Sequence, residues 1–193
     1  MSTLAPRHQL MIGAVLVALM AATRGQHFAT LNNLPGASWA VFFLAGVYLR
    51  PLWVFPMLIA TVTLLDYSAV TWGGAGTFCI TPAYAFLLPA YGALWLAGRW
   101  YAQYHHATMT RMIGRLTLSL LVGALLCELF SSGGFYFLSG RFAQTSLVEF
   151  GARLVKYFPH DLSSLAFYVG IAAVIHAALS AVNKHNVEST ISR

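Results

Sequence analysis

The sequence predicts an all-α integral membrane protein, a bundle of six transmembrane helices with both termini in the cytoplasm. Three observations predict this fold class: the composition, the number of apolar segments and the distribution of basic residues. Hydrophobic residues make up 59% of the 193 residues and charged residues only 8%, whereas a soluble domain carries about 25% charged residues. So few charges cannot cover a surface in water, and we therefore expect most of the surface to face lipid.

Six apolar segments are separated by charged residues, proline or glycine, and the whole chain, 1–193, is expected to form a single transmembrane domain. The last two segments are long enough to cross a hydrocarbon core of about 30 Å, whereas the first three are short for it. The expected spans are residues 10–22, 37–49, 52–65, 82–97, 113–130 and 162–182.

The apolar stretch from residue 37 to residue 65 is interrupted only by Arg50-Pro51. It could form one kinked helix of about 43 Å, or two short helices joined by a tight turn. We prefer the turn, because arginine in the middle of a bilayer is costly and a residue before proline is pushed out of helical geometry. The choice decides the topology, since five spans would place Asp66 and Cys79 on the face opposite His27.

The basic residues indicate the orientation. With six spans, seven of the eleven lie on the side that holds both termini, and the positive-inside rule makes this side cytoplasmic. His27, Asp66 and Cys79 then lie on the outer side. Basic residues spread over several loops are typical of topology signals and do not indicate nucleic-acid binding. The inner side holds Arg7, Arg50, Arg99, Arg111, Arg115, Lys184 and Arg193, and the outer side holds Arg24, Arg141, Arg153 and Lys156.

Residues 131–161 form a long outer segment for a compact membrane protein. Within it, apolar residues such as Leu147, Leu154 and Phe158 recur at helical spacing, with Glu149 and Arg153 on another face. This pattern predicts an amphipathic helix, approximately residues 144–158, that lies on the outer surface and covers a pocket.

The stretch from Asp66 to Tyr84, DYSAVTWGGAGTFCITPAY, is the most informative for function. Gly73, Gly74 and Gly76 allow the backbone to approach a ligand closely. Cys79 follows, and its thiolate would be a soft ligand suited to a soft or polarisable metal centre. The alternative is a buried cysteine that serves as a small apolar residue. Cys127 lies in an apolar run and is expected to pack there.

Four further side chains are candidates for a binding site, and each has a structural alternative. His27 is a ligand or hydrogen-bond donor, or else an interfacial histidine that faces water. Asp66 ends the third helix without a basic neighbour in sequence, so it has a partner or a ligand, or is simply exposed. Tyr84 lines a pocket or anchors the helix at the interface. Arg153 contributes to the site or pairs with Glu149 at i,i+4.

Other motifs of enzymes and energised transporters are absent from the sequence, which has no zinc signature, P-loop, nucleophile elbow or dinucleotide fingerprint. Glu128 is the one acidic residue deep in an apolar run, and we expect it to face the protein interior or the outer end of its helix. Ala14, Ala18 and Ala22 form a small-xxx-small stripe that permits close helix contact, within the chain or with a partner protein.

The single Cys79 in TWGGAGTFCITPAY, with His27 and Asp66 upstream, resembles the BtuM family of bacterial cobalamin transporters. More broadly, six helices, an alanine stripe and an outward-facing site resemble the substrate-binding S-components of energy-coupling factor vitamin transporters. The resemblance implies an S-component-like fold in the bacterial inner membrane and a vitamin B12 (cobalamin) site open to the periplasm. Cobalamin would be the bound substrate, and no separate cofactor is predicted.

The resemblance also implies roles for particular residues. Cys79 would ligate the cobalt of cobalamin and support the removal of cyanide from cyanocobalamin. His27, Asp66, Tyr84 and Arg153 would be candidate pocket residues. An energy-coupling module would dock on the alanine stripe, or the protein would work without one. The alternatives are an S-component for another vitamin and a membrane thiol-redox or assembly protein that uses Cys79.

Overall fold

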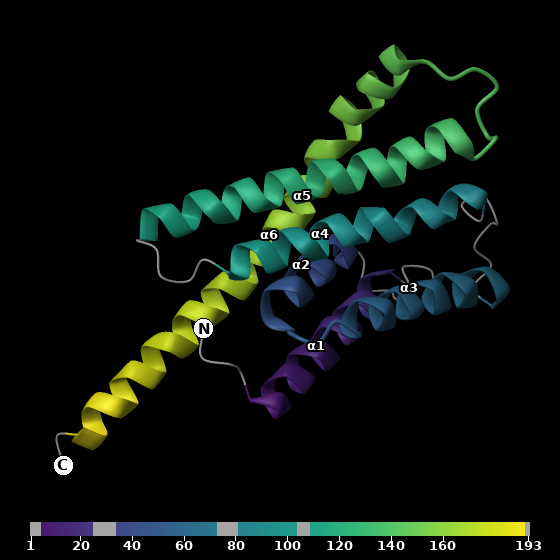
Figure 1. Ribbon diagram of the computed structural model, residues 1–193. Coiled ribbons are helices and arrows are strands. Elements are labelled where there is room, and N and C mark those ends of the chain that lie inside the picture. The colour runs from purple at the N-terminus through teal and green to yellow at the C-terminus, as the bar shows by residue number, and fades with distance from the viewer. Residues whose placement is uncertain (1–4, 25–33, 73–80, 104–108, 192–193) are drawn as a thin grey trace.

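The computed structural model describes residues 5–24, 34–72, 81–103 and 109–191, and every regular element within them is a helix (Figure 1). The all-α prediction is thereby confirmed for this part of the chain. The elements are α1 (Pro6–Arg24), α2 (Ser38–Tyr48), α3 (Val54–Thr71), the 3-10 helix η2 (Pro82–Phe86), α4 (Leu87–Ala102), α5 (Met109–Leu138) and α6 (Leu147–Ile191).

Three helical stretches within the described residues are long and apolar enough to cross a membrane, as expected of a membrane protein. They are Val54–Thr71, Thr110–Leu138 and Leu147–Val182. By contrast, α2 has 11 residues and is only about 16 Å long. The six-span arrangement and the cytoplasmic placement of both termini stay predictions.

The chain doubles back between α2 and α3. Leu49 caps α2 in an extended conformation, with φ −104° and ψ 119°, and α3 begins at Val54. Two short helices joined by a turn are therefore present here, in agreement with the preferred interpretation of the sequence. Proline explains the break, because Pro51 has no N–H for a helical hydrogen bond and restricts the residue before it.

Polar contacts tie the turn to one end of the bundle. The backbone N–H of Arg50 donates to Oε1 of Gln9 on α1, over 3.2 Å, and Nη1 of Arg99 on α4 donates to the Arg50 carbonyl, over 3.1 Å. The first turns of α1, the α2–α3 turn and the last turn of α4 therefore lie together. The end of α1, the start of α2, the end of α3 and η2 lie at the opposite end.

The core is centred on α2, which packs against α1, α4 and α6. The ring of Phe42 is fully buried and stacks on Tyr91 of α4 with centroids 4.3 Å apart. The backbones of α2 and α4 come into close contact at Gly46 and Gly98, where neither residue has room for a Cβ atom. Glycine at both positions lets the two helices approach this closely.

The second half of the chain differs from the sequence-based layout. Helix α5 continues past the expected end of its span to Leu138, and α6 runs without interruption from Leu147 through Pro159 to Ile191. The expected outer segment 144–158 is therefore not a separate helix, because most of it is the first part of α6. The polar residues His160 and Asp161 interrupt the apolar run but not the helix. Figure 1 shows α5 beside α4, with α6 crossing both obliquely.

Candidate functional site

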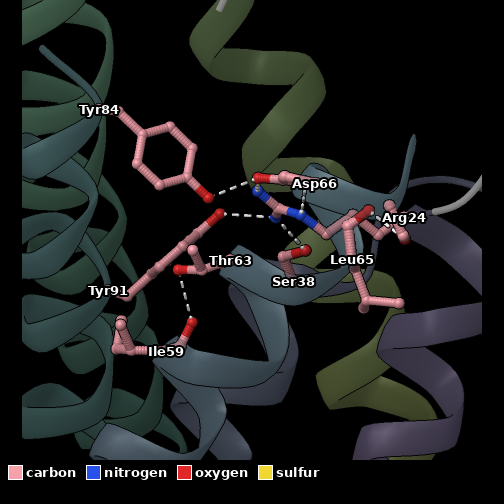
Figure 2. A network of polar contacts seen from close by, with 9 residues as sticks. Arg24, Ser38, Ile59, Thr63, Leu65, Asp66, Tyr84 and Tyr91 are labelled. Carbon is pink, nitrogen blue, oxygen red and sulfur yellow. Dashed lines mark hydrogen bonds and ion pairs between the residues drawn. The ribbon is translucent and has the colours of Figure 1, made fainter. Parts of the chain in front are cut away.

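An ion pair joins the end of α1 to the end of α3. Nε of Arg24 lies 2.6 Å from Oδ1 of Asp66, and Nη2 of Arg24 lies 2.7 Å from Oδ2 (Figure 2). This bidentate geometry is the strongest form of arginine–carboxylate contact, because two charge-assisted hydrogen bonds form in parallel. The two side chains are only 18% and 25% exposed, so solvent screens the pair only partly.

Three hydroxyl groups complete the arrangement, which we call the Arg24–Asp66 cluster: Arg24, Ser38, Asp66, Tyr84 and Tyr91. Nη1 of Arg24 donates to the hydroxyl oxygens of Ser38, at 2.9 Å, and of Tyr91, at 2.8 Å. The hydroxyl of Tyr84 donates to Oδ2 of Asp66 over 2.7 Å. Figure 2 shows these side chains converging on the guanidinium and the carboxylate. The cluster therefore connects α1, α2, α3, η2 and α4 at one end of the bundle.

The local chain path holds Arg24 in place. The hydroxyl of Thr23 donates to the Leu19 carbonyl and accepts a hydrogen bond from the backbone N–H of Ala37 over 3.1 Å, which ties the end of α1 to the start of α2.

Burial by itself lowers the pKa of Arg24, but the interactions with Tyr91 and Asp66 outweigh burial and raise that pKa above its ordinary value. The guanidinium is therefore charged at every physiological pH.

The structure brings together two of the predicted site residues, Asp66 and Tyr84. Of the alternatives left open for Asp66, namely a partner, a ligand or exposure, a partner is present: it is Arg24, which was not among the predicted site residues. Ser38 and Tyr91 were missed as well. The other two predicted residues of this end, His27 and Cys79, fall in segments 25–33 and 73–80 and lie outside the described residues.

Arg153 does not contact the Arg24–Asp66 cluster. Its Nη2 lies 3.0 Å from Oε1 of Glu149, one turn earlier in α6, with side-chain exposures of 39% and 51%. The i,i+4 pair predicted as an alternative is thus present. The guanidinium also lies over two aromatic rings, 4.7 Å from the centroid of Phe142 and 5.2 Å from that of Tyr136. Tyr136 donates its hydroxyl to Oε2 of Glu149 over 3.0 Å.

Arg153 lines a cavity of about 550 Å³ between α5 and the first part of α6, which we call the α5–α6 cavity. Five of its ten lining residues are aromatic, and four others carry polar or charged side chains. The lining residues are Glu128, Ser131, Ser132, Phe135, Tyr136, Phe142, Phe150, Arg153, Leu154 and Tyr157.

The cavity and the Arg24–Asp66 cluster lie at the same end of the molecule. On α5, a Cβ atom added at Gly134 would collide with Phe86 of η2, and one added at the preceding Gly133 would meet the ring of Phe150 of α6 at 3.3 Å. The 3-10 helix η2, which carries Tyr84, and the first part of α6, which carries Arg153, therefore contact neighbouring positions of α5. Tyr84 and Arg153 share an end of the bundle without touching.

Other predicted features have simple outcomes. Cys127 is fully buried, as expected of a packing residue. Ala14, Ala18 and Ala22 are exposed, so the stripe makes no close helix contact within the described part of the chain. The described residues contain no group of three or more His, Cys, Asp or Glu side chains able to hold a metal ion.

A scan against protein-family models finds no match to this sequence, and a comparison with curated proteins finds none either.

Proposed function

We propose that the protein binds cobalamin and takes it up across the bacterial inner membrane, with the thiolate of Cys79 as a ligand of the cobalt. The observation that carries this proposal is the contact of Arg24 with Asp66 and of Asp66 with Tyr84. Arg24 directly precedes the segment that contains His27, and Asp66 and Tyr84 lie on either side of the segment that contains Cys79. Their contact therefore brings the chain near both segments to one point.

Covalent geometry limits how far each segment reaches. His27 follows Arg24 by three residues, and Cys79 precedes Tyr84 by five. Since an extended chain covers at most about 3.6 Å per residue, the Cα of His27 is within roughly 11 Å of that of Arg24, and the Cα of Cys79 within roughly 18 Å of that of Tyr84. These limits allow a single ligand at this end of the bundle to contact both side chains, which supports the proposal of a shared site.

The chemistry of the proposed site follows from its residue types. A thiolate is a soft ligand and suits a polarisable cobalt centre. Its electron donation to Co(III) weakens the bond to cyanide on the opposite face, so that cyanide leaves with its electron pair. In this proposal His27 would accept the thiol proton, whereas Asp66 is already engaged by Arg24 and Tyr84. Asp66 would then shape the site, and Arg153 would contribute from its outer wall.

The proposed site opens to the periplasm, because the positive-inside rule assigns this end of the bundle to the outer face. Energy for uptake would come from a coupling module that docks on Ala14, Ala18 and Ala22, or the protein would act alone. The exposure of these alanines on α1 leaves their surface free for a partner helix or for lipid.

Uptake of labelled cyanocobalamin by bacterial cells without another cobalamin importer tests the proposed function. We expect cells with the wild-type protein to accumulate label and cells with Cys79→Ala to fall to the level of the empty vector. Cys127→Ala is the matched control, since Cys127 is buried among apolar residues and its removal should leave uptake intact. Immunoblots must show equal amounts of protein in the membrane.

Two outcomes would overturn the proposal: no uptake by the wild-type protein above the vector level, or full uptake by Cys79→Ala. In either case, a screen of other vitamins by thermal shift on the purified protein would then test the alternative of a different transported vitamin.

A further inference from the structure

The inner wall of the α5–α6 cavity carries a carboxyl group that the proposed cobalamin site does not use. Glu128 is only 3% exposed and lies within an apolar helix that is long enough to cross a membrane. The hydroxyl of Ser132, one turn later, donates to Oε1 of Glu128 over 2.6 Å. The second oxygen, Oε2, has no hydrogen-bond partner within the described chain.

The charged and titratable groups around Glu128 do not include a cation that pairs with it. From α6, Asp161 adds a like charge, and Arg153 is engaged by Glu149. Tyr136 and Tyr157 line the cavity together with Glu128, and the hydroxyl of Tyr136 donates to Glu149. Two ion pairs join residues that the structure describes, Arg24–Asp66 and Arg153–Glu149, and neither includes Glu128.

A carboxylate in this position is costly to keep ionised. Burial of a charge in an apolar environment without a counter-ion is strongly unfavourable, and the repulsion from Asp161 adds to this cost. A metal ion would require several oxygen ligands, and no suitable group of three acidic, histidine or cysteine side chains exists among the described residues. A proton needs only one carboxyl oxygen, and Oε2 has no other partner in the described chain.

We propose that Glu128 is a proton-binding site that exchanges its proton with water in the α5–α6 cavity. In the neutral acid, the O–H on Oε2 points away from Ser132, whose hydroxyl continues to donate to Oε1. When the cavity holds water, the proton leaves Oε2 for a water molecule and the carboxylate remains. This inference does not depend on which ligand the protein transports, because it rests on α5 and α6 alone.

Infrared spectroscopy of the purified protein in lipid nanodiscs tests the proposal. The chain has only five Asp and Glu residues, so the C=O stretching band of a protonated carboxylic acid can be assigned by substitution. We expect the wild-type protein to show this band at neutral pH and to shift it on transfer into D₂O. Glu128→Gln should remove the band, whereas Glu149→Gln, at an exposed position on α6, should leave it unchanged.

Two further variants keep the test decisive. Ser132→Ala removes the hydrogen bond to Oε1 and should move the frequency of the band in a folded protein. Asp161→Asn removes the neighbouring carboxyl group and should retain the C=O band of a protonated acid, because in this proposal the proton is bound to Glu128 and not to Asp161. A wild-type protein without the band, a band that survives Glu128→Gln but disappears in Asp161→Asn, or a band insensitive to D₂O would each overturn the proposal.

Discussion

Replacing Gly98 by alanine is expected to destabilise the bundle severely. A Cβ atom at this position would collide with the carbonyl oxygen of Phe43 on α2, and the reciprocal collision at Gly46 involves the carbonyl oxygen of Trp95 on α4. Backbone atoms cannot rotate away as a side chain can, so α2 and α4 would have to separate. Overpacking of a core costs about 1–3 kcal/mol and occasionally more, and we expect this change to cost at least about 3 kcal/mol.

Two other helical glycines provide the control for this prediction. Gly114 on α5 and Gly170 on α6 have open space where a Cβ atom would lie. Alanine is favoured over glycine in a helix by about 1 kcal/mol, so Gly114→Ala and Gly170→Ala should leave the thermal unfolding midpoint in detergent unchanged or slightly raised. A Gly98→Ala protein as stable as these two would show that α2 and α4 do not pack as described.

Replacing Arg24 by glutamine is expected to have the second large effect on stability. The change removes both hydrogen bonds to Asp66 and leaves its carboxylate, which is 25% exposed, with Tyr84 alone. Loss of one partner from a buried ion pair costs roughly 3–5 kcal/mol. Because this pair keeps some contact with solvent, we expect a loss of about 2–3 kcal/mol in the free energy of unfolding.

The matched control is Arg153→Gln, which breaks the exposed pair with Glu149 and should cost less than about 1 kcal/mol. Asp66→Asn combined with Arg24→Gln should be less damaging than the sum of the two single changes, since no unpaired charge then remains. Thermal unfolding of the wild-type protein, the three single variants and the double variant in one detergent measures these differences. Equal midpoints for Arg24→Gln and Arg153→Gln would mean that the cluster does not hold the bundle together.

Local chemistry made part of this fold predictable from the sequence. The scarcity of charge and the runs of apolar residues indicate helices in lipid, and the structure has only helices among its described elements. Arg50-Pro51 predicts a break, because the effects of proline on its own and the preceding residue are local. The lone acid of α5, Glu128, was expected to face the interior or the helix end, and it is buried.

Other features of the fold and of the site could not be predicted from the sequence, and the main one depends on contacts between residues far apart in the chain. Arg24 and Asp66 are separated by 42 positions, and nothing local to either residue indicates the other. The one sequence feature that could have suggested this ion pair is that both residues are predicted at the outer ends of their helices, Arg24 at the end of the first and Asp66 at the end of the third. The continuity of α6 has a different explanation: the sequence predicts a surface helix at about 144–158 and a separate span at 162–182, whereas His160 and Asp161 between them do not break the helix.

Ligation of cobalt by the sulfur of Cys79 is tested most directly by the absorption spectrum of protein purified from cells supplied with cobalamin. We predict that the wild-type and Cys127→Ala proteins carry a corrinoid spectrum with the features of a thiolate-ligated cobalt, and that Cys79→Ala lacks those features. A colourless wild-type protein, or a corrinoid spectrum that Cys79→Ala leaves unchanged, would contradict the proposal.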